Sequence, residues 1–197
     1  PDFEKKNLSG HLSHNLRYIP KNKIKYIGIL SQLKKHDVRK NIDYFVSLSG
    51  PEKTRDMLEK KILNQIKHLK GKIVVTGGKL DLNKKDIQNN LKTYSFLNTA
   101  QQEKIMNRSK FLIIRAGYTT LMEIVELDKK AILIPSPGQT EQEYLADYSK
   151  KNKYFYSVNQ NKINLKEDIE KSKRFNGFKS SWKTKESVKK FMELINS

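Results

Sequence analysis

Short apolar runs alternate with longer stretches in which apolar residues recur every three or four positions. Four runs, at 43–49, 72–76, 111–114 and 131–134, have the length and composition of strands. The last two are continuous enough to suit strands buried on both faces of a parallel sheet. Strands that alternate with helices indicate an α/β fold, with an open, mostly parallel, Rossmann-like sheet and helices on both faces.

The remaining elements follow from the same patterns. We expect further strands at 24–30, 91–97 and 154–158, and a polar stretch over 77–90. Helices are expected at 51–69, 99–108, 140–151 and 183–195, and as a crossover between the strands at 111–114 and 131–134. We expect one core, because a chain of 197 residues buries roughly 70% of its unfolded surface.

Composition divides the chain into three parts. Residues 1–23 carry few apolar anchors, and we expect a linker or arm that leads from an N-terminal domain outside this sequence. Residues 24–165 hold all the expected strands and form the predicted Rossmann-like domain. Residues 166–197 are charged and helical, and we expect them to pack back toward the N-terminal domain. The first residue is Pro1 and not Met, which suggests a piece of a longer protein.

The chain is strongly basic, with 40 Lys and Arg against 21 Asp and Glu and a formal net charge of +19. This charge fits a nucleic acid, an anionic membrane surface, a phosphorylated ligand or a lysine-rich solvated surface. Lysine dominates the count and is scattered, and the aromatic residues fall mostly inside apolar runs. Nucleic-acid modules instead concentrate their charge and expose aromatic residues. The lysine-rich surface is therefore favoured, and a basic nucleic-acid-binding module stays as the alternative from another class.

Composition and motifs disfavour several kinds of site. The absence of cysteine removes disulfides, thiolate catalysis and cysteine-zinc sites, and suits a reducing cytoplasm. No run of about 18 apolar residues occurs, so we expect a protein that is soluble or at most peripheral to a membrane. We expect it in the cytoplasm, where it could lie at the inner face of the membrane. Neither the turn at 49–51 nor that at 76–78 matches the dinucleotide fingerprint, and no P-loop motif occurs. Nicotinamide, flavin and P-loop nucleotide sites are therefore disfavoured.

The stretch 111–147 holds most of the candidate chemistry. Along it stand Ile114-Arg115-Ala116-Gly117, Thr119-Thr120, Glu123, Ile134-Pro135 and Gln139 to Tyr144. This arrangement resembles the C-terminal domain of GT-B glycosyltransferases, in particular the family 28 domain of peptidoglycan N-acetylglucosaminyltransferases. A Gly/Ser turn at 47–50 and a Phe-containing segment at 95–97 resemble two further parts of that family. The resemblance spans residues 24–160.

The resemblance implies one half of a GT-B fold, the half that binds a nucleotide-sugar donor. Specific roles come with it. It implies that Phe96 and Leu97 lie beside the uracil, that Glu123 accepts hydrogen bonds from the ribose, that Ser49, Gly50, Gly117, Thr119 and Thr120 hold the diphosphate, and that Gln142 and Glu143 contact sugar hydroxyls. Arg115 could offset phosphate charge. A carboxylate suits a ribose because it accepts from two vicinal hydroxyls.

The implied activity is transfer of a hexosamine, with N-acetylglucosamine expected, from a UDP-sugar to an acceptor hydroxyl. We expect no metal or other cofactor, because the helices after Gly50 and Gly117 would present N–H groups to the diphosphate. The catalytic base is expected on an N-terminal acceptor domain, in the same chain or in a split partner subunit. This half is therefore expected to be inactive alone. A lipid-linked acceptor and an anionic membrane surface are further expected partners.

Each assigned residue also has an ordinary structural interpretation. Glu123 has the capping-box spacing from Thr120. Gly50 and Gly117 suit any strand-to-helix turn, because glycine frees the backbone there. Phe96 fits a core position as well as a base-stacking one.

Two departures from the family pattern leave the donor sugar open. Pro51 follows Gly50 and lacks an N–H that could meet phosphate. Glu143 stands where a glutamine is common, so a carboxylate faces the expected sugar position. A UDP-sugar 2-epimerase or a nucleotide-sugar hydrolase of similar fold is the alternative enzyme.

Overall fold

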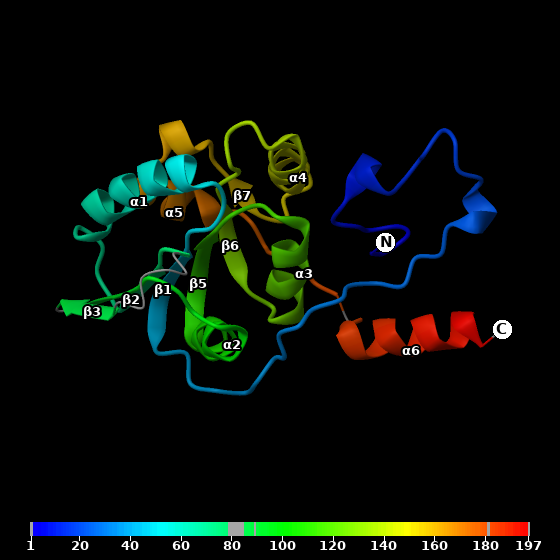
Figure 1. Cartoon of the computed structure of the whole chain (residues 1–197), viewed down its shortest axis with the longest axis horizontal. Coiled ribbons are helices and arrows are strands. Elements are labelled where there is room, and N and C mark those ends of the chain that lie inside the picture. Colours follow the sequence, from blue (N-terminus) through cyan, green and yellow to red (C-terminus); the bar gives the residue numbers. More distant parts are fainter. Residues whose placement is uncertain (1, 79–84, 89, 181, 197) are drawn as a thin grey trace.

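The computed structural model of the chain describes residues 2–78, 85–88, 90–180 and 182–196, which form a seven-stranded sheet flanked by helices (Figure 1). The sheet has the order β3-β4-β2-β1-β5-β6-β7. Its strands are β1 (Ile42–Ser47), β2 (Ile73–Thr76), β3 (Lys85–Gln88), β4 (Leu91–Tyr94), β5 (Ser109–Ile114), β6 (Lys130–Leu133) and β7 (Tyr156–Ser157). All neighbouring strands are parallel except β3 and β4. The predicted open, mostly parallel α/β sheet is confirmed.

Helices cover both faces of this sheet, as predicted. Apolar side chains of α1 and α5 pack on one face and those of α2, α3 and α4 on the other. The helices are α1 (Glu52–Ile66), α2 (Thr99–Arg108), α3 (Tyr118–Glu126), α4 (Thr140–Lys151), α5 (Leu165–Ser172) and α6 (Thr184–Ile195). Single 3-10 turns occur at Gly10–Leu12, Lys21–Lys23 and Gln160–Lys162.

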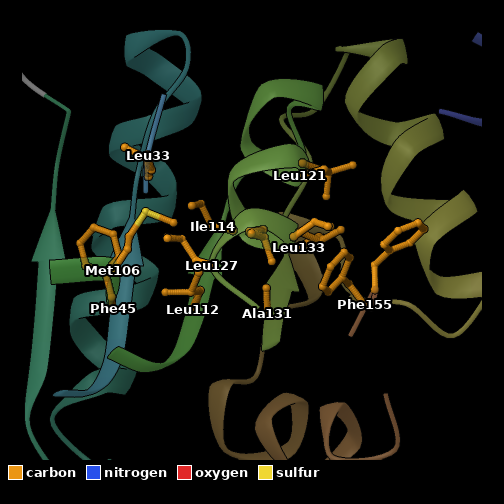
Figure 2. Packing of buried hydrophobic residues seen from close by; sticks show 14 of the residues in the cluster. Leu33, Phe45, Met106, Leu112, Ile114, Leu121, Leu127, Ala131, Leu133 and Phe155 are labelled. Carbon is orange, nitrogen blue, oxygen red and sulfur yellow. The ribbon is translucent and has the colours of Figure 1, made fainter. Parts of the chain in front are cut away.

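The core has two halves because successive strand residues point to opposite faces of the sheet. In β5, Leu112 and Ile114 join the cluster under α2, α3 and α4, while Ile113 joins the cluster under α1 and α5. Figure 2 shows the first cluster, in which Phe45 and Met106 pack beside these β5 residues. Leu112, Ile113 and Ile114 of the apolar run at 111–114 are thus buried between helices on both faces, as the pattern predicts, and Phe111 is half-buried.

The strand expected at 24–30 is wrong. This segment runs as irregular backbone past α3 and α6, and Gly28 has a φ of +96°, which breaks an extended strand. The Gly28 N–H donates to Asp2 O at 3.2 Å, and the Leu30 N–H approaches Met122 Sδ at 3.4 Å. Loop packing buries Ile29, which is 0% exposed, whereas Leu30 is 42% exposed. Periodicity alone does not separate these two kinds of burial.

The edge next to β4 also differs from the prediction. β4 ends at Tyr94, three residues before the predicted end, and pairs antiparallel with β3. β3 lies in the stretch predicted to be a polar loop, because its sequence Lys-Asp-Ile-Gln has the short polar character that edge strands tolerate. The rest of that predicted loop, at 79–84 and 89, lies outside the described residues.

The two ends of the chain lie on the same side of the molecule (Figure 1). Residues 2–14 pack on α4, where the His11 N–H donates to the Tyr144 hydroxyl at 2.6 Å and the Tyr148 hydroxyl donates to Asn7 Oδ1 at 3.0 Å. α6 is fastened at its start, where the Thr184 N–H and hydroxyl both donate to Glu126 at 2.9 Å. No helix in the described part of the chain is long and apolar enough to cross a bilayer.

Candidate functional site

Three loops meet at the carboxyl edge of the sheet. β1, β5 and β6 are parallel neighbours, so the segments that follow them, with Ser49-Gly50, Arg115 to Gly117 and Pro135-Ser136, leave from the same edge. Gly50 has a φ of +105°, and a Cβ at this position would stand 3.1 Å from Ser136 Oγ. The first and last of these loops therefore touch, although 86 positions separate them in the sequence (136 minus 50).

The helices that follow these three strands start without side-chain caps. No side chain caps the first turn of α1, α3 or α4 from the N-cap positions Pro51, Gly117 and Gln139. By contrast, Asn98 caps α2 in a capping box and Asn164 caps α5. Because the first N–H groups of a helix have no partner within it, three uncapped starts at one edge leave donors available to an anion.

The start of α3 is the most favourable of the three for negative charge. α1 carries Glu52 in its first turn and α4 carries Glu141 and Glu143, whereas the first turn of α3 carries no acid. Gly117 has a φ of −73°, so the expectation that glycine frees the backbone at this turn is wrong. An added Cβ would meet only Thr120 Oγ1 at 3.7 Å. The missing side chain leaves the helix start open.

Glu123 lies on α3, half-buried, with no hydrogen bond or ion pair to its carboxylate among the described residues. The capping box with Thr120 is wrong, because Gly117 is the N-cap and Thr120 lies within the helix. Burial raises the pKa of Glu123 above its ordinary value. A carboxylate that loses water without gaining a donor is costly, and a ligand hydroxyl would compensate that loss.

Arg115 is 1% exposed, directly after β5. Its Nε donates to Ser49 O at 3.0 Å, and its Nη1 donates to Ile134 O and Pro135 O, both at 3.3 Å. Its Nη2 reaches Thr54 O at 3.5 Å. Burial lowers the pKa of Arg115 to about 10, which leaves the guanidinium charged at neutral pH. The side chain therefore faces the backbone of the loops and not the solvent.

Gln142 and Glu143 hold the loop between β6 and α4. The Ser136 N–H donates to Gln142 Oε1 at 3.0 Å, and the Gly138 N–H donates to Glu143 Oε1 at 3.0 Å. Gln142 Nε2 donates to Gln139 Oε1. Glu143 is exposed and Gln142 is half-buried, so both side chains border solvent while they shape the loop.

Phe96 and Leu97 differ from each other in exposure. Both follow β4, which β2 separates from β1, so these two strands lie about 10 Å apart in the sheet. Phe96 is 43% exposed, whereas Leu97 is 5% exposed and belongs to the core. Thr119 is exposed on the first turn of α3.

Sequence reasoning missed Ser136. This residue is 0% exposed, and its hydroxyl has no hydrogen-bond partner among the described residues. A hollow of about 680 Å³ borders the site at Pro135 and Glu143 and extends between α4 and the end of β7, away from Gly50 and Gly117. The only sequence signal for Ser136 is its place between two prolines after a buried strand.

Comparison with protein families gives a match over nearly the whole chain. The model of the glycosyltransferase family 28 C-terminal domain matches residues 10–196. The chain belongs to this family. Family 28 membership agrees with the resemblance in the stretch 111–147. Comparison with curated protein sequences gives no match.

Two solved structures with similar folds are glycosyltransferases. MurG of Acinetobacter baumannii is 14% identical with a TM-score of 0.52, over 88% of this chain and 53% of that one. The glycotransferase of kitacinnamycin is 9% identical with a TM-score of 0.58, over 90% of this chain and 50% of that one. At this identity the likeness shows the fold alone. This family 28 domain spans about half the length of both.

The carboxyl edge of this family 28 domain offers several polar groups to a ligand. Among the described residues, no group of three or more His, Cys, Asp or Glu could hold a metal ion. The described residues instead offer the uncapped N–H groups at the start of α3, the Glu123 carboxylate on the same helix and the Ser136 hydroxyl in the loop after β6. This set suits a ligand with both an anionic part and hydroxyl groups.

Proposed function

We propose that this domain binds the UDP-sugar donor of a glycosyltransferase that moves a hexosamine, N-acetylglucosamine, to an acceptor hydroxyl. The proposal rests on the start of α3, which no side chain caps and whose first turn holds no acid, and on Glu123 of the same helix, whose carboxylate has no partner among the residues that the structure describes. The diphosphate would take the N–H groups of Tyr118, Thr119 and Thr120, and the ribose hydroxyls would donate to Glu123.

The proposed reaction is direct displacement at the anomeric carbon of the donor. The acceptor oxygen forms the new bond, and the UDP diphosphate leaves with the electron pair of the broken bond. N–H groups at the start of α3 stabilise the charge that develops on the leaving diphosphate. The base that takes the acceptor proton would come from an acceptor-binding half, in the same protein or in a partner subunit. The domain alone would bind donor and transfer nothing, with no metal or other cofactor for binding.

The remaining contacts follow from where the side chains lie. Phe96, exposed after β4, would stack on the uracil, and the chain around Leu97 would hold its edge. Gln142 and Glu143, at the start of α4, would contact the sugar hydroxyls. Glu143 would exchange its bond to the Gly138 N–H for a sugar hydroxyl. An acidic contact at this point favours a hydroxyl donor over a second anion.

The test is calorimetric titration of the chain with UDP and with 2′-deoxy-UDP. Glu123→Ala should weaken UDP binding by about tenfold, and weaken 2′-deoxy-UDP binding less, because that ligand has already lost one ribose donor. Glu193→Ala, which removes an exposed glutamate of α6, is the matched control and should change neither. Equal UDP affinity in wild type and Glu123→Ala would discard the ribose assignment.

Titration with UDP-N-acetylglucosamine, UDP-glucose and UDP-galactose identifies the sugar. N-acetylglucosamine should bind tightest, and a preference for a sugar without the acetamido group would overturn that part of the proposal. Product analysis with the complete protein separates transfer from its alternatives. A glycoside product indicates transfer, whereas free sugar or a 2-epimer indicates a hydrolase or an epimerase.

We also propose that the basic surface meets an anionic membrane at the cytoplasmic face, where a lipid-linked acceptor would lie. The net charge of +19 supports an electrostatic attraction that salt weakens. The chain should sediment with vesicles that contain anionic lipid, and not with neutral vesicles. Tight, salt-sensitive binding to an oligonucleotide by a chain that ignores UDP would instead favour the nucleic-acid-binding module.

A further inference from the structure

Arg115 is a buried cation without an acidic partner. Its side chain is 1% exposed, and its four acceptors are the backbone carbonyls of Ser49, Thr54, Ile134 and Pro135. No carboxylate lies within 4.0 Å of its guanidinium among the described residues. Buried arginines are ordinarily paired with a carboxylate, because the transfer of an unpaired charge from water is costly. This fold retains the charge and leaves it uncompensated.

The four carbonyls belong to the segments that shape the candidate site. Ser49 lies in the loop after β1, Thr54 in the first turn of α1, and Ile134 and Pro135 in the loop after β6. Arg115 itself precedes the N-cap of α3 by two positions. A guanidinium is a planar fork that holds several acceptors in one geometry. One side chain thus ties together the approaches to all three uncapped helices.

A second observation points to a ligand at the same junction. Ser136 is 0% exposed, and its hydroxyl stands against the Gly50 turn with no partner among the described residues. Buried hydroxyls are nearly always hydrogen-bonded. The junction that Arg115 holds therefore carries an unsatisfied hydroxyl as well as an uncompensated positive charge. An anionic ligand with acceptor oxygens would satisfy both.

We propose that Arg115 is a positioning residue for the donor diphosphate, which sets the three loops at the carboxyl edge and supplies a buried positive charge that the diphosphate compensates. This inference rests on the proposed donor-binding function. It assigns Arg115 no direct contact with the ligand, because its donors already point at backbone carbonyls. Its effect reaches the nucleotide through the geometry of the loops and through electrostatic attraction, which is stronger in the protein interior than in water.

The experiment compares UDP with uridine, which lacks the diphosphate, in titrations of the chain and of Arg115→Met and Arg115→Lys. Arg115→Met should weaken UDP binding by about tenfold or more and leave uridine within about twofold of wild type. Arg115→Lys keeps the charge but not the planar fork of the guanidinium. Its UDP affinity should lie between those of wild type and Arg115→Met. Lys129→Met is the matched control. It removes another buried cation that donates to carbonyls, at Asn107 and Ser109 on the opposite edge of the sheet, and should leave the UDP-to-uridine ratio unchanged.

Each outcome decides the inference. A folded Arg115→Met or Arg115→Lys with the wild-type UDP-to-uridine ratio overturns it, as does an equal loss for both ligands. If Arg115→Met does not fold, Arg115→Lys decides alone. Amide hydrogen exchange without nucleotide tests the positioning role independently of binding. Exchange at 50–54 and 134–138 should be faster in the Arg115 variants than in wild type, and unchanged in Lys129→Met. A wild-type chain that does not bind UDP would instead refute the proposed function, and unchanged exchange would then refute the positioning role.

Discussion

At the scale of single residues, the protein uses buried cations to hold backbone carbonyls. Lys129 is 5% exposed, and its Nζ donates to Asn107 O at 2.7 Å and Ser109 O at 2.6 Å, where α2 ends and β5 begins. Burial, helped by Lys40 and Lys35, lowers the pKa of Lys129 to about 8. Like Arg115, this cation donates only to carbonyl oxygens among the described residues.

This environment predicts a pH dependence of stability. Between pH 8 and the unfolded lysine pKa of about 10.4, the unfolded chain binds more protons at this site than the folded one, so stability rises with pH through that window. Across the whole window the free energy of unfolding should rise by about 3 kcal/mol. In denaturant titrations from pH 7 to 10.5, the free energy of unfolding should rise less steeply with pH for Lys129→Met than for wild type. Lys60→Met, at an exposed position of α1, is the control and should keep the wild-type slope.

Gly50 is the residue whose backbone the site most depends on. Its φ of +105° disfavours any residue with a Cβ, and that Cβ would stand 3.1 Å from Ser136 Oγ. Gly50→Ala should cost about 1–3 kcal/mol of unfolding free energy and also weaken UDP binding. Gly138 also has a positive φ, at +80°, but a Cβ added there would have no atom within 4 Å. Gly138→Ala should therefore lose less unfolding free energy than Gly50→Ala. Equal losses in denaturant melts would show that the contact with Ser136 has no effect.

At the scale of elements, the helix starts divide into capped and uncapped ones. α2 and α5 are capped by asparagine side chains, whereas the three helices that face the candidate site are not. An N-cap residue typically contributes about 1 kcal/mol relative to alanine. The protein therefore forgoes stability where it would gain a ligand, as functional sites commonly do.

Gly117→Asp tests whether the start of α3 is left uncapped in order to bind a ligand. Its φ of −73° and ψ of 146° already suit an aspartate N-cap, and the space for a Cβ is open. The variant should be at least as stable as wild type, because the new carboxylate would cap α3. It should nevertheless lose most of its UDP affinity, because the same carboxylate would occupy the proposed diphosphate position. Gly117→Ser, which is neutral, should lose less affinity. Unchanged UDP binding in a folded Gly117→Asp would contradict the diphosphate position.

At the scale of the whole molecule, α6 leaves an apolar stripe exposed. Val188, Phe191, Met192 and Ile195 are each between 46% and 57% exposed, although their spacing is that of a buried helix face. The chain spans about half the length of MurG of Acinetobacter baumannii. We propose that the acceptor-binding half covers this stripe, which extends the expectation that residues 166–197 pack toward that half.

Phe191→Glu tests this proposal. In this chain alone the substitution should change stability by less than about 0.5 kcal/mol and leave UDP affinity unchanged, because the side chain is exposed. In the complete protein it should reduce transfer. Lys189→Ala is the control, because it lowers the net charge by the same single unit on the same helix. It should change neither the stability of the chain nor transfer by the complete protein. A large stability loss in the chain alone would show that the stripe already packs within this domain.

Pattern and local chemistry were enough to predict the alternation of strands and helices and the buried run at 111–114. They also place Gly50, Arg115 and Gly117 just after strands, because a parallel α/β sheet sends such residues to one edge. Local chemistry failed at 24–30, where loop packing buries Ile29 without a strand, and at β3, whose four residues include a single apolar one, Ile87.

Only the tertiary structure decided how these residues act together. The order of the strands brings the carbonyls of Ser49 and Pro135 to the Arg115 guanidinium, and no local pattern encodes contacts made across 66 and 20 positions. Burial is likewise a long-range property. The Ser136 hydroxyl and the Glu123 carboxylate, which have no partner in the part of the chain that the structure describes, are therefore apparent only once the chain has folded.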